Sequence, residues 1–289
     1  MPDSSEHSTH PNGHVLVVLS GADSIPLKEG HTHPTGHFLG EVTEPLEALL
    51  NAGHRLTFTS PSGKSPTIDQ NSYQLIYWGL SKSNLDNAKA VYQHLVELGF
   101  ESPHPLEELV DLSPECDRPT PQPKLEPFDA VFIPGGHAPM VDLLHTNFFT
   151  SDEMNPYVGE LLYFFHRTQR PTGLICHAPA VLAAAPSVQG TWIYSGYKMT
   201  AITMLSEFIA EDLPLMKTVG GHLKEYPTGI LKNAGATLEQ SLIPMVPKVV
   251  EDRELLTGQD PYSAKQFGEQ FVQKLNVFLA DKCPADKHS

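Results

Sequence analysis

Residues 14–20, HVLVVLS, begin the strand–helix–strand unit that decides the fold of this chain. Their short, valine-rich apolar run is typical of a buried parallel strand. Residues 40–53 follow with apolar side chains at helical spacing and end in glycine, which predicts a helix. Residues 55–63, RLTFTSPSG, predict a second strand that ends in a turn. Strand, helix and strand in this order predict an α/β fold with a flavodoxin-like, doubly wound and mostly parallel sheet.

Between residues 66 and 126 the alternation of strands and helices stops. This segment contains one helical pattern, NAKAVYQHLVELGF, and ends in the proline-rich RPTPQPKLEP, which is typical of an extended loop. We therefore expect a small inserted cap over residues 66–126, packed on the sheet. The polar residues 1–13 predict a flexible tail, so that the α/β domain covers residues 14–289.

The alternation resumes after the cap. FDAVFIPGGHAP predicts a strand that ends at Gly135-Gly136, a helix is expected around residues 159–168, and PTGLIC predicts the next strand. The runs APAVLAAAP and GGHLKEYPTGILKNAG predict two further helices, and the chain is expected to end in another. The segment with three histidines between the first strand and the first helix is expected to be a loop.

The net charge of −15 argues against two classes of partner. Nucleic-acid backbones and anionic membrane surfaces both attract basic proteins, so we expect no nucleic acid and no membrane as partner. No apolar run approaches the ~20 residues needed to span a bilayer, and the polar N-terminal residues lack the pattern of a signal peptide. The three cysteines are too scattered for a disulfide framework. Together these features predict a cytoplasmic protein.

Cys176 lies at the end of the apolar run GLIC, directly before His177 and a predicted helix. In a doubly wound sheet, ligands bind beyond the carboxyl ends of the strands. A helix N-terminus at this place would lower the pKa of the thiol and favour the reactive thiolate, as in the nucleophile elbow of serine hydrolases. A buried structural cysteine fits the same run equally well. Position alone therefore does not decide between a nucleophile and a core residue.

Two further features are expected at the same edge of the sheet. The glycine pair lets the backbone approach a ligand closely, so the N–H groups of Gly136 and His177 would form an oxyanion hole. Glu41 follows the loop after the first strand. A carboxyl group partly removed from water beside a thiol would stay protonated and share a hydrogen bond with the thiolate. A tight turn and an ordinary helix glutamate are the alternative interpretations.

Four motifs together resemble the PfpI/ThiJ superfamily, and within it the branch of HchA-like heat-shock chaperones and glutathione-independent glyoxalases (glyoxalase III). This fold is also described as class I glutamine amidotransferase-like. The resemblance extends from about residue 14 to residue 280 and keeps the order of the motifs along the chain. They are GHFLGEVTEPLEALLNAG with the later TFTSPSG, AVFIPGGHAPMVDL, GLICHAPAVL and VVEDRELLTGQDPYSA.

The resemblance implies a role for four acidic, histidine or cysteine side chains. Cys176 matches the family's nucleophile, His177 its histidine partner, and Glu41 the acidic residue that contacts the thiol. The third member of the triad is expected after the next strand, within TAITMLSEFIAED. Counting from that strand places it at Glu207 and leaves Glu211 open.

No metal and no other cofactor is expected. In metal-binding relatives the ligands lie on the helix after the glutamate and on the next strand, where this chain has Leu50 and Arg55. The histidines His31, His33 and His37 lie close enough in sequence to suggest zinc. They lack both a helical i, i+4 pair and a cysteine partner, so we favour a role in the substrate pocket or a solvated loop.

The resemblance implies an enzyme that converts methylglyoxal and related α-oxoaldehydes to 2-hydroxy acids through the cysteine, with deglycation of proteins as a further activity. It also implies a homodimer. Ala138 and Ala178 replace glycines of the family's motifs, and their methyl groups would narrow the site or change its substrate. The alternatives are a stress-induced holdase that binds unfolded proteins, with apolar residues of YQLIYWGL in the cap as its surface, and a cysteine amidase or peptidase.

Overall fold

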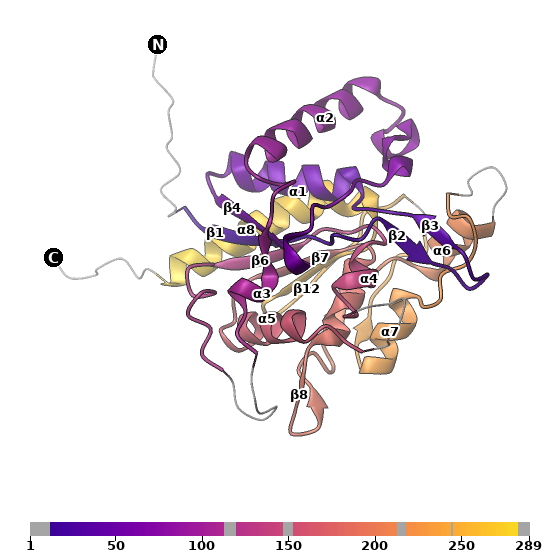
Figure 1. Cartoon of the computed structure of the whole chain (residues 1–289). Coiled ribbons are helices and arrows are strands. Elements are labelled where there is room, and N and C mark those ends of the chain that lie inside the picture. The colour runs from indigo at the N-terminus through magenta and orange to yellow at the C-terminus, as the bar shows by residue number, and fades with distance from the viewer. Residues whose placement is uncertain (1–11, 113–119, 147–152, 213–217, 244, 283–289) are drawn as a thin grey trace, which may run out of the picture.

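The computed structural model describes a central seven-stranded sheet with helices on both faces (Figure 1). The strand order is β12-β13-β7-β6-β1-β4-β5, and neighbouring strands are parallel except β12 and β13. This confirms the predicted α/β fold with a mostly parallel sheet. The described residues are 12–112, 120–146, 153–212, 218–243 and 245–282. The strands are β1 (His14–Val18), β4 (Arg55–Ser60), β5 (His104–Pro105), β6 (Ala130–Ile133), β7 (Thr172–Ile175), β12 (Val249–Asp252) and β13 (Leu255–Gly258).

Side chains of β1 alternate between two hydrophobic cores, one on each face of the sheet. Val15 and Val17 belong to the core under α1 (Leu39–Asn51) and α8 (Ala264–Lys282). Leu16 and Val18 belong to the core that α5 (Pro156–Arg167) covers from the other face. A strand buried on both faces reads as a continuous apolar run, which is why the first strand could be predicted.

The segment expected as a cap begins with two short 3₁₀ helices, η2 (Gln70–Tyr73) and η3 (Leu75–Trp78). Its long helix α2 (Lys82–Glu97) packs on the outer side of α1 (Figure 1). The segment then supplies β5, which pairs with β4 at the edge of the central sheet, and the short α3 (Leu106–Leu109). Residues 66–126 therefore contribute to the sheet as well as lying over α1.

Three local predictions differ from the structure. The histidine segment forms an antiparallel hairpin of β2 (Ser24–Pro26) and β3 (Thr32–Pro34), whose strands are too short to show a period of two. The expected helix after β7 is the 3₁₀ helix η4 (Ala178–Ala184). The later helix is restricted to α7 (Pro227–Ala234), which begins at its proline, where the missing N–H costs no hydrogen bond of the helix.

None of the helices within the described ranges is long and apolar enough to cross a membrane. Most of the predicted tail (residues 1–11), together with Cys116 and Cys283, lies outside the described residues. The other elements are η1 (Pro61–Gly63), α4 (Pro139–Asp142), β8 (Ser187–Val188), β9 (Thr191–Trp192), β10 (Lys198–Met199), α6 (Met204–Asp212), β11 (Thr237–Leu238) and η5 (Pro261–Ser263).

Candidate active site

The candidate site lies at the carboxyl ends of three neighbouring central strands. Gly135 and Gly136 follow β6, and Cys176 directly follows β7, which pairs with β6 in parallel. The loop after β1 leads through the β2–β3 hairpin to Glu41 in the first turn of α1. Parallel strands end at the same edge of a sheet, so these turns bring residues from distant parts of the chain together.

The backbone of Cys176 is in a left-handed conformation, with a φ of 64°. Its N–H donates to the Gly258 carbonyl at 2.9 Å, and its carbonyl accepts from the N–H of Ile202 at 3.0 Å. A left-handed residue other than glycine costs roughly 1–3 kcal/mol, which the surrounding structure must offset. Strain at a single residue between a strand and a helical turn is the backbone geometry of a nucleophile elbow.

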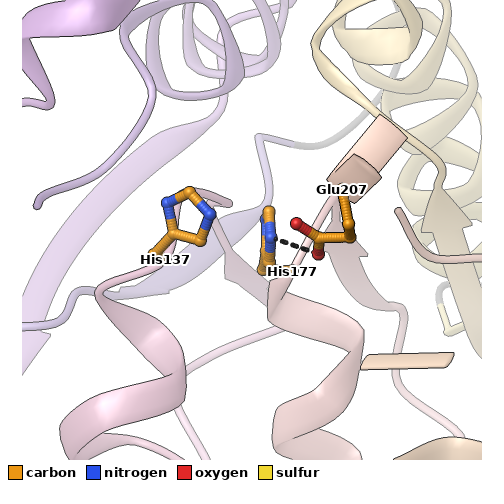
Figure 2. Close-up of side chains that lie close together, drawn as sticks. All are labelled: His137, His177 and Glu207. Atoms are coloured by element: carbon orange, nitrogen blue, oxygen red, sulfur yellow. Dashed lines mark ion pairs between the residues drawn. The ribbon is translucent and has the colours of Figure 1, made fainter. Parts of the chain in front are cut away.

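Cys176, His177 and Glu207 form a chain of close contacts. The Cys176 sulfur lies 3.2 Å from Nδ1 of His177. Nε2 of the same ring lies 2.9 Å from Oε1 of Glu207 (Figure 2). All three residues are buried. Glu207 reaches the ring from the first turn of α6. The adjacent positions of Cys176 and His177 explain why Nδ1, rather than Nε2, faces the sulfur.

Glu211, the alternative third residue, has other partners. Its Oε1 accepts a hydrogen bond from the N–H of Leu223 at 2.8 Å, and its Oε2 accepts from the Tyr226 hydroxyl at 2.8 Å. These bonds connect α6 to the segment before α7. The structure therefore brings Glu207 to His177, while Glu211 anchors a neighbouring loop.

Burial sets the protonation states of the histidine and the glutamate. It lowers the pKa of His177 to about 3 and raises the pKa of Glu207 to about 7. Removing either group from water disfavours its charged form. The imidazole is thus neutral near pH 7. In the tautomer that carries its proton on Nε2, the Nδ1 atom has a free lone pair for the thiol proton.

Glu41 lies against the glycine turn beside Cys176. A Cβ atom on Gly135 would overlap Oε2 of Glu41 and lie 2.8 Å from the Cβ of Cys176. The carboxyl group is fully buried, and burial raises its pKa well above the ordinary value. Neither carboxyl oxygen makes a hydrogen bond of ordinary length and angle within the described ranges, although Cys176 and the Gly136 N–H lie close enough to favour the charged form of the group. Glu41 is therefore a neutral carboxyl group that has a proton to donate toward the sulfur.

The pKa of Cys176 shifts in the direction opposite to that expected from the sequence. Burial first, and then the carboxyl group of Glu41, raise the thiol pKa well above its usual range. The sulfur belongs to a residue that is only 3% exposed, and the following helical turn is a short 3₁₀ segment. Desolvation outweighs any helix dipole here. Near neutral pH the cysteine is therefore a thiol.

We expect iodoacetamide to alkylate Cys176 at least ~10-fold more slowly near neutral pH than an exposed cysteine, because only the thiolate reacts. The rate should continue to rise with pH beyond the range of an ordinary thiol. Peptide mass spectrometry at several times and pH values measures this rate. Cys283, in the polar sequence ADKCPADKHS, is the reference in the same chain. Faster alkylation of Cys176 than of Cys283 at neutral pH would show a lowered thiol pKa and contradict the expectation.

Gly136 shapes the other wall of the site. Its φ is 100°, and a Cβ there would overlap the Gly36 carbonyl and lie 2.8 Å from the Cα of His37. Only glycine fits this turn without strain. The Gly136 N–H stabilises the carboxylate form of Glu41, though less than burial disfavours it. This N–H therefore lies near the Glu41 carboxyl group, which adjoins Cys176.

The three histidines of the β2–β3 region are in different environments. His37 is fully buried, with its Nε2 accepting from the Ser20 N–H at 2.8 Å and its Nδ1 donating to the Gly135 carbonyl at 2.9 Å. Burial lowers its pKa to about 4. Both ring nitrogens are thus engaged, and the ring connects the glycine turn to the loop after β1. His33 accepts from the exposed Gly220 N–H at 3.3 Å, and His31 is exposed.

His137 is a site residue that was not singled out from the sequence. It directly follows the glycine pair, and its ring centroid lies 4.1 Å from that of His177. Figure 2 shows the His177 ring between His137 and Glu207. Burial lowers the pKa of His137 to about 4, so that it is a neutral imidazole beside another one. The histidine in PGGHAP, immediately after a turn at a strand end, was the available signal.

Comparison with known proteins gives consistent matches. A family model described as ThiJ/PfpI family-like matches residues 33–210, more than half of the chain. A protein/nucleic acid deglycase HchA of Pseudomonas aeruginosa is 26% identical over 287 residues, covering 94% of this chain and 85% of the relative. The protein of the same name from Shigella sonnei is 24% identical, covering 92% and 82%.

Two solved structures have a similar fold. The rapid encystment protein of Francisella tularensis has a TM-score of 0.66 and 21% identity, covering 91% of this chain and 99% of that protein. Glyoxalase III of Candida albicans has a TM-score of 0.61 and 17% identity, covering 91% and 97%. At these identities the likeness concerns the fold.

Proposed function

Because the chain belongs to the ThiJ/PfpI family, we propose that it converts methylglyoxal and related α-oxoaldehydes to 2-hydroxy acids through Cys176, without glutathione. The observation that carries this proposal is the set of contacts around the sulfur. A neutral imidazole lies 3.2 Å from it, and a buried, neutral carboxyl group adjoins it. The names of the relatives, an HchA deglycase and a glyoxalase III, support the same chemistry.

The first step forms a carbon–sulfur bond. The Cys176 sulfur attacks the aldehyde carbon C1 as its proton moves to Nδ1 of His177, which lies 3.2 Å away. The aldehyde oxygen becomes an oxyanion that the N–H groups of Gly136 and His177 stabilise, and it then takes the proton from His177. The product is a neutral hemithioacetal, and His177 is again free to act as a base.

The second stage moves hydrogen from C1 to C2. His177 removes the C1 proton while the neutral Glu41 donates its proton to the C2 oxygen, which gives an enediol. His177 then protonates C2, and Glu41 takes back a proton from the C1 hydroxyl. The result is a thioester of a 2-hydroxy acid. Water hydrolyses it to the acid and restores the thiol. In all of these steps Glu207 positions the His177 ring, because its Oε1 lies 2.9 Å from the ring's Nε2.

The relatives' names add a second class of substrate. They are called protein/nucleic acid deglycases, so we extend the proposal to α-oxoaldehyde adducts on proteins. The name also stands against the exclusion of nucleic acids that the net charge of −15 suggested. That charge disfavours tight binding to a phosphate backbone. It does not prevent the active site from reacting with a small adduct on a nucleobase.

The test of the proposed function uses purified full-length protein with methylglyoxal and no glutathione. We expect formation of lactate, measured with stereospecific lactate dehydrogenases, in proportion to the protein added. Added glutathione should not raise the rate, because the thiol that carries the substrate is Cys176. Consumption of methylglyoxal without lactate, or dependence on glutathione, would contradict the proposal.

A holdase is the second candidate, supported by exposed apolar side chains. Of the expected cap surface, Trp78 is buried while Leu80 is 76% exposed. More apolar side chains are exposed on α6 and nearby: Met204, Leu205, Phe208, Leu242, Ile243, Met245 and Val246. Such surface fits either an unfolded chain or the second copy of the proposed cytoplasmic homodimer. Suppression of aggregation of a model substrate by Cys176→Ser would support the holdase, and sedimentation analysis tests the dimer.

A further inference from the structure

Three buried polar atoms without hydrogen-bond partners lie close together around the His177 ring. Within the described ranges, Nε2 of His137, Nε2 of His177 and Oε1 of Glu207 make no hydrogen bond. His177 Nε2 and Glu207 Oε1 are 2.9 Å apart but are not aligned as donor and acceptor. Buried polar atoms are rarely left in this state, because each costs free energy unless something binds it.

The same three residues have the composition of a metal site. One ligand atom from each of them lies within 4.8 Å of the others. Two imidazole nitrogens and one carboxylate oxygen are a ligand set typical of Zn²⁺, with the fourth position left to water. Zn²⁺ bonds of about 2.1 Å place neighbouring ligand atoms about 3.4 Å apart. The His177–Glu207 pair, at 2.9 Å, has to open slightly, whereas ligand atoms as far as 4.8 Å apart have to close in by roughly 1.4 Å. His137 is only half-buried, and it is the ligand that would move.

We propose that the chain binds one Zn²⁺ ion through His137, His177 and Glu207. The three ligands come from the turn after β6, the turn after β7 and the first turn of α6 (Figure 2). These are not the ligand positions of metal-binding relatives, which Leu50 and Arg55 occupy here. The Cys176 sulfur contacts Nδ1, the ring nitrogen opposite to the metal-binding one. The thiol is therefore not a ligand.

Metal binding and the proposed catalysis exclude each other. Zn²⁺ occupies Nε2 of His177 and the carboxylate of Glu207, which removes the contact that positions the ring. The ion also fixes the imidazole as a ligand, so that it no longer relays protons between sulfur and substrate. This consequence, unlike the binding itself, rests on the proposed function. Zn²⁺ bound at this site therefore inhibits the thiol enzyme, and removal of the ion restores its activity.

The test is calorimetric titration of Zn²⁺ into full-length protein freed of metal with a chelator. We expect one tight site per chain in the wild type, weakened about 100-fold or more in His137→Gln, which loses a ligand but keeps the thiol. Glu207→Gln should weaken it similarly. Cys176→Ser should stay within about threefold of the wild type. His94→Gln, on the exposed face of α2, is the matched control for surface histidines and should not change the tight site.

Cobalt(II) gives a second readout that is independent of activity. Co²⁺ in this site should show visible d–d absorption without a thiolate-to-cobalt charge-transfer band, because sulfur is not a ligand. In the methylglyoxal assay, Zn²⁺ should inhibit the wild type, and excess chelator should restore its activity. A protein that binds zinc but shows no turnover would contradict the proposed function alone.

Two results would overturn the metal site. The first is equal affinity of the wild type and His137→Gln for Zn²⁺ while both remain folded by circular dichroism. The second is loss of the tight site in Cys176→Ser together with a thiolate charge-transfer band in the wild type. That outcome would assign zinc binding to the cysteine instead of the His137–His177–Glu207 cluster.

Discussion

Replacing Cys176 with serine is expected to lower the turnover of methylglyoxal about 10³-fold or more. A hydroxyl group is a far weaker acid than a thiol. Its proton would have to move to His177, whose pKa burial lowers to about 3. Serine also replaces the thioester of the proposed mechanism by an ester. The single change removes one nearly buried sulfur, so the fold should persist. Steady-state rates with methylglyoxal and far-ultraviolet circular dichroism measure both effects.

Cys116→Ser and Cys283→Ser are the matched controls for this experiment. Both cysteines lie in polar sequence outside the described residues, and neither follows a strand of the central sheet. We expect each variant to stay within about twofold of the wild-type rate, as is usual for changes away from a site. Equal activity of all three variants would remove Cys176 from the mechanism. A loss in Cys283→Ser alone would move the reactive thiol to the C-terminal tail.

The sequence predicted the fold because the central strands are locally encoded. A strand buried on both faces is a short apolar run, as in residues 14–18 and 172–175, and each run ends at a recognisable turn. The residues at those turns were predicted for the same reason. The edge strand His104–Pro105 and the β2–β3 hairpin were missed, because two or three residues have no measurable period.

The contacts of the site depend on tertiary packing that the sequence does not display. Glu207 and Glu211 are one helical turn apart and both are buried, so spacing alone did not separate them. Packing of α6 decides that the first meets His177 and the second binds the Tyr226 hydroxyl. His37 was grouped with exposed histidines by proximity in sequence, although it is fully buried.

The direction in which the pKa of Cys176 shifts could not be predicted from the sequence either. A thiol before a predicted helix indicates a lowered pKa, but this holds only while the sulfur stays in contact with water. Here burial raises the pKa of Cys176 instead, and Glu41 adds to the effect. The same burial keeps Glu41 protonated and His177 neutral. The site therefore holds neutral groups that exchange protons only when a substrate enters.

Glu207→Gln is expected to lower kcat for methylglyoxal about 10²–10⁴-fold with little change in KM, as for the loss of the orienting acid in a triad. The amide keeps the size of the carboxyl group but also lets His177 adopt the other tautomer. The same substitution should increase the free energy of unfolding near neutral pH, whereas it lowers kcat. Burial raises the pKa of Glu207 to about 7, so the folded state holds a proton that the unfolded state releases near its ordinary pKa of 4.5. The wild type therefore loses stability between pH 4.5 and about 7, whereas the variant avoids this loss.

Glu211→Gln is the matched control, one turn further along α6. Its side-chain oxygen still accepts from the Leu223 N–H, and only the bond to the Tyr226 hydroxyl is rearranged, at a cost of about 1 kcal/mol. We expect slightly lower stability and an unchanged kcat, the reverse of the Glu207→Gln result. Urea unfolding at pH 5 and pH 8, together with kinetics on both variants, separates the two glutamates. A larger loss of kcat in Glu211→Gln than in Glu207→Gln would reject the contact at His177 Nε2 as the one that positions the ring.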